Sequence, residues 1–268
     1  MGTRLAVGAV ELRPSGAVDV SILFSLFAGA LVKRSGGADL AREARQLVGE
    51  SFGEHPESLK PKEFRQALER ARLSLQEPLF RNIALQLLQD LGLSTKGLRL
   101  DLVRLRAVAP GLEDIDAAAP VFYPHRDTWY GNPKCQINAW IPLQDVDQNN
   151  SFRFYLDHFE TGIANDSKHF SANSFRGFGK VAPAERCCYP RAQTTPRGKV
   201  HDVCIKNGEV LLFSAAHLHQ TLPNQTDRVR FSVDFRFFYQ HHLTTEAGAP
   251  DPDNQSRGLC IEGYLPCS

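Results

Sequence analysis

The stretch R-V-R-F-S-V-D-F-R-F-F-Y at residues 228–239 decides the fold class of this chain. From residue 230 onward polar and apolar side chains alternate, and successive side chains of a β-strand point to opposite faces. The stretch therefore predicts one long strand with a charged face and an apolar face. The charged face carries Arg230, Ser232, Asp234 and Arg236, and the apolar face carries Phe231, Val233, Phe235 and Phe237.

Other segments in the second half of the chain also predict strands, because they alternate or are rich in branched apolar residues. The turn dipeptide Asn207-Gly208 directly precedes one of them. Several strands without helices between them favour an antiparallel sandwich or barrel. The predicted strands cover residues 98–108, 137–143, 151–159, 209–213 and 228–239.

The first third of the chain predicts helices. Residues 38–50 place apolar side chains on one face at helical spacing. The helical pattern of residues 61–91 divides at Pro78, because proline lacks a backbone N–H and clashes with the preceding turn. The apolar run at residues 20–32 is too short to span a bilayer, and it predicts a buried helix.

We expect one domain over residues 1–268. It divides into a mostly helical part at 1–97, a strand-rich core at 98–240 and an irregular tail at 241–268. Residues 162–206 within the core are polar and marked by proline and glycine, and a loop of this length predicts a lid over a site.

The composition is that of a globular protein with a core. Hydrophobic residues make up 42% and charged residues 23%, which excludes a disordered or coiled-coil chain. Lys and Arg total 31 and Asp and Glu total 30, so there is no basic excess for binding nucleic acid or an anionic membrane. The six cysteines contain no C-x-x-C pair. Since the sequence has no secretory leader pattern and no transmembrane stretch, we expect a cytoplasmic protein.

A candidate metal site begins at the tripeptide H-R-D, residues 125–127. In an extended segment His125 and Asp127 point the same way and can offer a nitrogen and an oxygen atom to one ion. The third ligand has to come from another strand, and the candidate is His219, with His217 as its rival. Two imidazoles and one carboxylate form the facial triad of non-heme Fe(II) oxygenases, which leaves positions open for cosubstrate and O₂.

An arginine on the long strand points to the cosubstrate. Arg230 follows His219 by eleven residues and lies on the charged face. An unpaired buried charge is costly, so it requires an anionic partner, and a guanidinium matches a carboxylate. A diacid that chelates iron at one end would place its second carboxylate there. The spacing therefore predicts 2-oxoglutarate as well as Fe(II), with Arg228 as the rival of Arg230.

These residues resemble a known family. The H-x-D motif at 125–127 and the stretch H-Q-T-L-P-N-Q-T-D-R-V-R at 219–230 are similar to the Fe(II)/2-oxoglutarate-dependent dioxygenases, in their phytanoyl-CoA dioxygenase-like branch. The distal motif of that branch, H-x-x-x-P-N-x-x-x-x-x-R, fits position for position and favours His219 over His217 and Arg230 over Arg228. The resemblance covers residues 98–239. It implies a double-stranded β-helix, or jelly roll, buttressed by the N-terminal helices.

The resemblance also implies the reaction. Ferrous iron binds 2-oxoglutarate and O₂, succinate and CO₂ are released, and an unactivated C–H bond of the substrate is hydroxylated. Related halogenases have Ala or Gly at the carboxylate position, so Asp127 favours hydroxylation. The segment 125–143 and the N-D-S stretch at 165–167 are similar to the Kdo 3-hydroxylases, which implies a sugar or another small polar molecule, such as a natural-product intermediate.

Further residues are candidates for contacts around the metal. Gln136 and Asn138 share a strand face and could hydrogen-bond 2-oxoglutarate or the substrate. The remaining candidates concern the substrate. The aromatic pair Trp129 and Tyr130 follows the ligands directly, and it stacks on the substrate or packs the mouth of the barrel. Arg236 binds an anionic group or forms a salt bridge, and the polar lid residues Asn165 and Ser167 contact the substrate.

Two other classes of protein fit parts of the pattern. A cupin-type metalloenzyme would use the triad without 2-oxoglutarate and would give Arg230 no anionic partner. A non-catalytic jelly-roll module that binds carbohydrate would keep the histidines for structural reasons.

Overall fold

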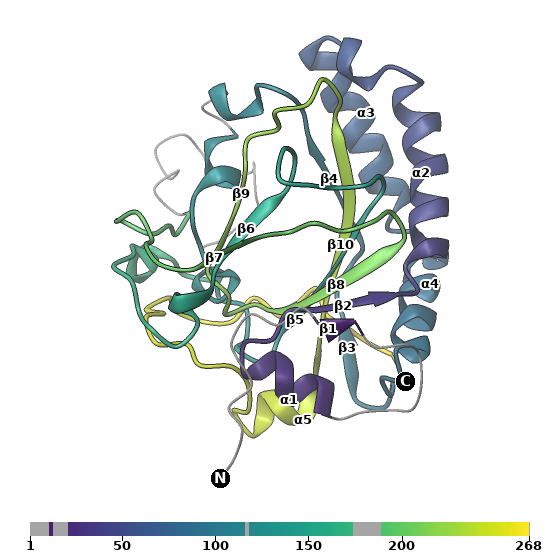
Figure 1. Cartoon of the computed structure of the whole chain (residues 1–268). Helices are drawn as coiled ribbons and strands as arrows, with labels where there is room; N and C mark the ends of the chain where they lie inside the picture. Colours follow the sequence, from purple (N-terminus) through teal and green to yellow (C-terminus); the bar gives the residue numbers. More distant parts are fainter. Residues whose placement is uncertain (1–10, 13–20, 116–117, 174–188, 268) are drawn as a thin grey trace.

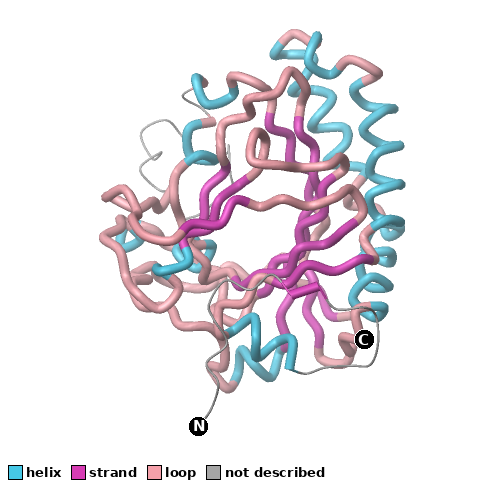
Figure 2. Tube along the Cα trace, viewed as in Figure 1, coloured by secondary structure: helices cyan, strands magenta, loops and turns pink. Residues whose placement is uncertain are grey.

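The protein consists of two β-sheets that face each other, with helices on the outside of the larger sheet (Figure 1). The computed structural model describes residues 11–12, 21–115, 118–173 and 189–267. Within these residues the sheets form the predicted jelly roll without closing into a barrel, and Figure 2 shows the two groups of strands apart from each other.

The larger sheet has eight strands in the order β1-β2-β8-β5-β10-β3-β11, and β4 also pairs with β10. Its neighbours are antiparallel except for β1 and β2, which run parallel. In chain order the strands are β1 (Glu11–Leu12), β2 (Val32–Ser35), β3 (Leu98–Leu100), β4 (Arg104–Val108), β5 (Ile137–Pro142), β8 (Glu209–Ser214), β10 (Arg230–Tyr239) and β11 (Leu265–Pro266).

The smaller sheet has three strands in the order β7-β6-β9. They are β6 (Phe152–Tyr155), β7 (Val200–Asp202) and β9 (His219–Thr221). One apolar cluster joins the sheets: Trp140 and Phe213 of the larger sheet lie with Phe152 and Phe154 of the smaller one. The space between the sheets is therefore partly filled by aromatic side chains.

Strand β10 confirms the alternation that the sequence predicts. The apolar face, Phe231, Val233, Phe235 and Phe237, lies in the main core with the helices. The charged face looks toward the smaller sheet, because directly opposite residues of paired strands share a face and Asp234 pairs with Trp140 of the cluster between the sheets. The charges of β10 therefore line the interior of the jelly roll.

Three helices cover the outer face of the larger sheet (Figure 1). They are α2 (Ala38–Phe52), α3 (Pro61–Ser74) and α4 (Pro78–Asp90). Pro78 divides the second helical pattern as predicted, and it begins α4, where its missing N–H leaves no hydrogen bond unmade. No helix among the described residues is long and apolar enough to cross a membrane.

The predicted helix at residues 20–32 is wrong in its extent. Helix α1 covers only Ser21–Phe27, and the chain then continues as β2. The break falls at Gly29, whose φ of 89° is unfavourable for other residues, and an added Cβ there would lie 2.7 Å from the Phe159 ring. The first 97 residues therefore supply two strands of the larger sheet, β1 and β2, as well as helices.

Three other predicted elements differ in detail. The strand expected at 98–108 is divided at Asp101, whose carboxylate accepts a hydrogen bond from the Leu102 N–H, and both parts pair with β10. The strand expected at 151–159 ends at Tyr155. The tail, which was expected to be irregular, contains α5 (Gln240–Thr244) and β11.

Short 3₁₀ helices cover Pro56–Ser58, Leu112–Asp114, Ala119–Phe122, Asp127–Tyr130, Leu156–His158 and Ser167–His169.

The expected lid at 162–206 is described only in part, since residues 174–188 lie outside the described residues. Its beginning contains the 3₁₀ turn Ser167–His169, and its end supplies β7 to the smaller sheet.

Candidate metal centre

Three side chains converge at one point between the sheets. The backbones of His125 and His219 pair through two hydrogen bonds of 2.9 Å, so segments 94 residues apart lie side by side. One ligand atom from each of His125, Asp127 and His219 lies within 4.8 Å of the others. The Nε2 atom of His125 is 3.8 Å from Oδ1 of Asp127. The residues that the sequence pattern selects thus form one cluster.

Backbone carbonyl groups fix the orientation of both imidazoles. Nδ1 of His125 lies 2.8 Å from the carbonyl oxygen of Tyr123, and Nδ1 of His219 lies 2.9 Å from that of His217. A carbonyl oxygen only accepts hydrogen bonds, so each Nδ1 carries the hydrogen atom and each Nε2 carries a lone pair. This arrangement is typical of metal-binding histidines, whose second nitrogen donates to a carbonyl or carboxylate.

A chain of buried amides positions the carboxylate. Asn138 donates a hydrogen bond of 2.6 Å to Oδ2 of Asp127, and Gln136 donates one of 2.8 Å to Oδ1 of Asn138. The Tyr264 hydroxyl in turn donates to Oε1 of Gln136. In this structure the two amides orient Asp127, and their contact with 2-oxoglutarate or the substrate stays a prediction.

We expect Asn138→Ala to weaken metal binding by roughly 10- to 100-fold, the usual effect of removing a partner of a metal ligand. Titration with Ni(II) measures this change. Asn224→Ala is the matched control, because Asn224 is a buried asparagine that hydrogen-bonds the carbonyl groups of Val108 and Arg228, outside the cluster. Equal metal affinity in Asn138→Ala and wild type would contradict the role of this amide.

The protonation states of the cluster suit a divalent cation. Burial lowers the pKa of His125 to about 4, so its ring is neutral at pH 7. Burial alone would raise the pKa of Asp127, but the positive charge of Arg236, with smaller contributions from His219, His125 and Asn138, lowers it to about 2. A neutral imidazole and an ionised carboxylate are the forms that bind a metal.

Arg230 lies on the inner face with no acidic partner among the described residues. Only 3% of its surface is exposed. Its guanidinium donates to the carbonyl oxygen of Asn150 at 3.1 Å and to the Ser232 hydroxyl at 2.8 Å, and it lies over the Trp140 ring. Burial lowers the pKa of Arg230 to about 10. A buried cation that meets only neutral groups is the arrangement expected where an anionic ligand completes the site. The rival Arg228 is exposed.

His217 lies outside the metal cluster. Its fully buried ring packs against Phe159, with 4.5 Å between ring centroids, and against Phe154, with 5.2 Å. Burial lowers the pKa of His217 to about 3. The geometry therefore favours His219 over His217, as the spacing of the distal motif does.

The two aromatic residues after the ligands face different ways. The Tyr130 ring meets the His125 ring edge to face, with 5.4 Å between centroids, and its hydroxyl donates to the Pro190 carbonyl. Trp129 is fully buried, and its indole N–H donates to Asp253. Tyr130 therefore borders the centre, and the burial of Trp129 agrees with the packing alternative, while its contact with a substrate stays a prediction.

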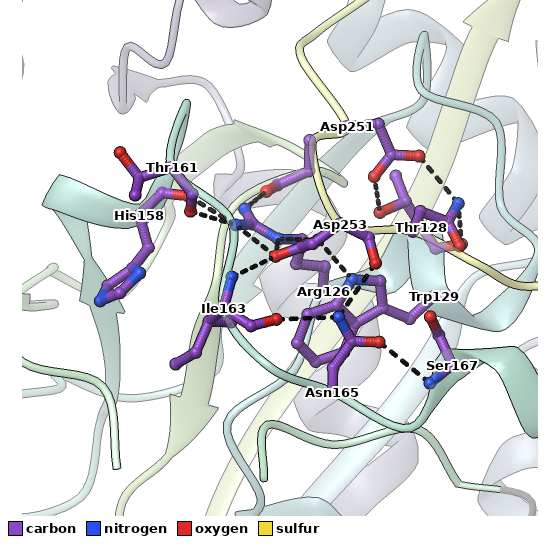
Figure 3. Close-up of polar contacts among 12 residues, drawn as sticks. Arg126, Thr128, Trp129, His158, Thr161, Ile163, Asn165, Ser167, Asp251 and Asp253 are labelled. Carbon is purple, nitrogen blue, oxygen red and sulfur yellow. Dashed lines mark hydrogen bonds and ion pairs between the residues drawn. The ribbon is translucent and has the colours of Figure 1, made fainter. Parts of the chain in front are cut away.

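Asn165 and Ser167 form hydrogen bonds within the protein. The Asn165 amide donates to the carbonyl oxygens of Ile163 and Asp253, and its oxygen accepts the Ser167 N–H (Figure 3). The Ser167 hydroxyl accepts the N–H of Gln255. These polar groups join the lid to the C-terminal segment, and contact of Asn165 and Ser167 with a substrate stays a prediction.

Sequence reasoning missed the ion pair behind the metal ligands. Arg126 lies between His125 and Asp127 in the chain, and its fully buried guanidinium contacts both carboxylate oxygens of Asp253 at 3.0–3.2 Å (Figure 3). It also donates to the carbonyl oxygens of Ala216, next to the distal ligand segment, and of His158. Arg126 therefore joins both ligand-bearing segments to the tail.

A second acidic residue supports the same segment. Asp251 accepts a hydrogen bond from the Thr128 hydroxyl at 2.8 Å, and Asn254 donates to the Thr128 carbonyl and to Asp251 (Figure 3). The sequence D-P-D-N at 251–254 was the available signal, but the residues of the ligand segment that it contacts, Arg126, Thr128 and Trp129, lie more than 120 residues earlier.

Comparison with known proteins gives one family and several solved structures. Residues 62–232 match the model of the phytanoyl-CoA dioxygenase (PhyH) family. EvdO2 from Micromonospora carbonacea var. aurantiaca is 11% identical, with a TM-score of 0.54 over 84% of this chain and 93% of that one. Its complex with 2-oxoglutarate gives a TM-score of 0.53 over the same shares.

A third structure is HygX from Streptomyces hygroscopicus with nickel and 2-oxoglutarate bound. It is 16% identical, with a TM-score of 0.46 over 84% of this chain and 88% of that one. A search of the curated proteins finds no match. Because the sequence identity is only 11%, the similarity to EvdO2 shows the fold alone.

Proposed function

Because this chain belongs to the phytanoyl-CoA dioxygenase family of Fe(II)- and 2-oxoglutarate-dependent oxygenases, we propose that it uses His125, Asp127 and His219 to hold ferrous iron and hydroxylates a C–H bond of a small polar substrate. The observation that carries the proposal is the convergence of one ligand atom from each of two imidazoles and one carboxylate within 4.8 Å. This donor set is that of the facial triad.

Ferrous iron would supply the oxidation chemistry, and the protein would hold the iron in place. With iron bound, O₂ and 2-oxoglutarate react to give succinate and CO₂, and one oxygen atom goes to the substrate. The Tyr123 and His217 carbonyls keep both Nε2 atoms directed at the ion, and Asn138 keeps Oδ1 of Asp127 free for it. Burial of these groups limits their rotation and excludes water.

Arg230 is the residue that we assign to the distal carboxylate of 2-oxoglutarate. Three features support the assignment: the guanidinium is buried, no described carboxylate pairs with it, and it lies on the inner face of β10. Asn150 and Ser232 occupy two of its nitrogen atoms and orient the planar group. A guanidinium held in this way can form parallel hydrogen bonds to a carboxylate.

We expect Arg230→Gln to raise the Kd for 2-oxoglutarate by roughly 10- to 100-fold, since a charge-assisted hydrogen bond contributes about 1.5–3 kcal/mol. The measurement is a titration of the Fe(II) protein with 2-oxoglutarate under anaerobic conditions, read from the visible charge-transfer band. The exposed Arg228→Gln is the matched control and should bind normally. Unchanged affinity in Arg230→Gln would contradict the assignment.

The visible charge-transfer band also distinguishes an oxygenase from a cupin-type metalloenzyme and from a non-catalytic module. A visible band after addition of Fe(II) and 2-oxoglutarate, followed by release of succinate on exposure to O₂, is the expected result. Iron binding without the band would favour a cupin-type metalloenzyme. Absence of iron binding would favour a jelly-roll module that binds carbohydrate.

For the substrate we propose a sugar or a natural-product intermediate. The inner face of β10 carries Arg230, Ser232, Asp234 and Arg236, so polar groups line the interior near the metal. Mass spectrometry of reaction mixtures with a panel of sugars and amino acids tests this class, and an added oxygen atom in a member of the panel is the expected product.

A further inference from the structure

Arg236 is a second inward-facing arginine, and it lies beside the metal ligands. On the inner face of β10 it pairs in register with Asn138, whose amide donates to Asp127. Side chains directly opposite each other in paired strands lie close together on one face. Asp127 is also the strongest favourable charge near its guanidinium and raises the pKa of Arg236, although burial alone would lower it.

The carboxylates around Arg236 are committed to other cations. Asp101 forms an ion pair of 2.5 Å with Arg104, and Asp234 forms one of 2.5 Å with Arg106. Asp127 is needed for the metal and accepts the Asn138 amide. No carboxylate of the described residues lies within ion-pairing distance of the Arg236 guanidinium. Arg236 is therefore a partly buried cation whose acidic neighbours all have closer partners.

Metal and cosubstrate do not remove this excess of positive charge. Ferrous iron adds two positive charges, and Asp127 balances one of them. The dianion of 2-oxoglutarate balances the other together with Arg230, so the charge of Arg236 stays uncompensated. Partly buried charges of this kind are costly unless an anion pairs with them.

Arg230 and Arg236 serve different anionic groups. They are six residues apart on one strand, which places their Cα atoms about 20 Å apart. The two guanidiniums are therefore anchored at separate positions along the inner face of β10. A planar guanidinium pairs best with a carboxylate or a phosphate, through two parallel hydrogen bonds.

We propose that the substrate carries a carboxylate or phosphate group and that Arg236 binds this group next to the metal. This inference rests on the proposed function, because it requires iron and 2-oxoglutarate to occupy the site first. It narrows the substrate to an acidic small molecule, such as a sugar acid or a sugar phosphate. Neutral sugars and amines would leave the Arg236 charge without a partner.

The first experiment uses inorganic sulfate as the anionic probe. Sulfate is titrated calorimetrically into the protein loaded with Ni(II) and saturated with 2-oxoglutarate, so that the metal and Arg230 are already occupied. We expect one saturable site in the wild type, weakened at least 10-fold in Arg236→Gln and partly retained in Arg236→Lys. Arg228→Gln, which removes an exposed charge near the start of the same strand, should bind sulfate like the wild type.

The second experiment separates a substrate group from a cosubstrate group. The charge-transfer titration should give Arg236→Gln a Kd for 2-oxoglutarate within about threefold of wild type, and a Ni(II) titration should give similar metal affinity. A loss of 2-oxoglutarate affinity of 10-fold or more would overturn the proposal, because Arg236 would then hold the cosubstrate. Absence of a sulfate site in the wild type, or an equal site in Arg236→Gln, would overturn it as well.

The third experiment compares acids with their neutral parents. Sugar acids and sugar phosphates should stimulate succinate formation in the wild type more than the parent sugars do, and this difference should vanish in Arg236→Gln. Stimulation by the neutral members alone would overturn the proposal. A wild type that forms no charge-transfer band at all would instead refute the proposed function, so the two failures are distinguishable.

Discussion

Replacing His219 by alanine abolishes metal-dependent turnover and weakens metal binding more than about 100-fold. The replacement removes one of only three protein ligands, and even partners of ligands account for 10- to 100-fold in metal affinity. Titration with Ni(II) measures the affinity, and succinate release in the presence of Fe(II), 2-oxoglutarate and O₂ measures turnover. His125→Ala and Asp127→Ala should give the same result.

His217→Leu is the matched control for this prediction. The ring of His217 packs between Phe154 and Phe159, and only its backbone oxygen contacts His219. Leucine keeps an apolar side chain in this space and leaves the backbone oxygen unchanged. Metal affinity should therefore stay within a few-fold of wild type. If the leucine variant lost the metal while His219→Ala kept it, the distal ligand would be His217.

Replacing Asp253 by asparagine destabilises the fold and weakens metal binding, although this residue lies far from the ligands in the sequence. Its two oxygens accept hydrogen bonds from Arg126, the Trp129 indole and the Ile163 N–H. An amide presents a donor to one of these groups and leaves Arg126 as a buried charge without a counterion. Breaking a buried ion pair costs about 3–5 kcal/mol.

The loss should appear in two measurements. Denaturant unfolding of the metal-free protein should show the lower stability, and Ni(II) titration under folding conditions should show affinity reduced roughly 10- to 100-fold, because Arg126 connects the segments that carry all three ligands. The matched control is Asp202→Asn, which breaks the partly exposed pair with Arg153 and should cost about 1 kcal/mol or less. A destabilised Asp253→Asn with unchanged metal affinity would limit Asp253 to a role in folding.

The metal cluster itself was predictable from the sequence. His125 and Asp127 are two residues apart, and residues 219–230 match the distal motif, in which the arginine follows the histidine by eleven residues. The first spacing is informative because side chains two residues apart in an extended segment point the same way. The same regularity explains why the two faces of β10 were correctly predicted.

The hydrogen bonds that hold the metal cluster in place were not predictable from such spacings. Gln136 and Asn138 were correctly placed on one face, but the sequence could not show that the Asn138 amide donates to Asp127 and the Gln136 amide to Asn138. Trp129, Asn165 and Ser167 have the residue types of binding sites, and their polar groups are used by the C-terminal segment. A residue type states which bonds a side chain can form and leaves the choice of partner open.

The sequence by itself determined the alternating strands, the break at Pro78 and the two motifs that carry the ligand triad, because each of these depends on residues close together in the chain. Only the tertiary structure decided that Asp253 pairs with Arg126 across 127 positions and that Arg236, opposite Asn138, forms no ion pair within the described part of the chain. These contacts depend on how the sheets and the C-terminal segment pack against each other. That packing is a property of the whole chain, and no local pattern records it.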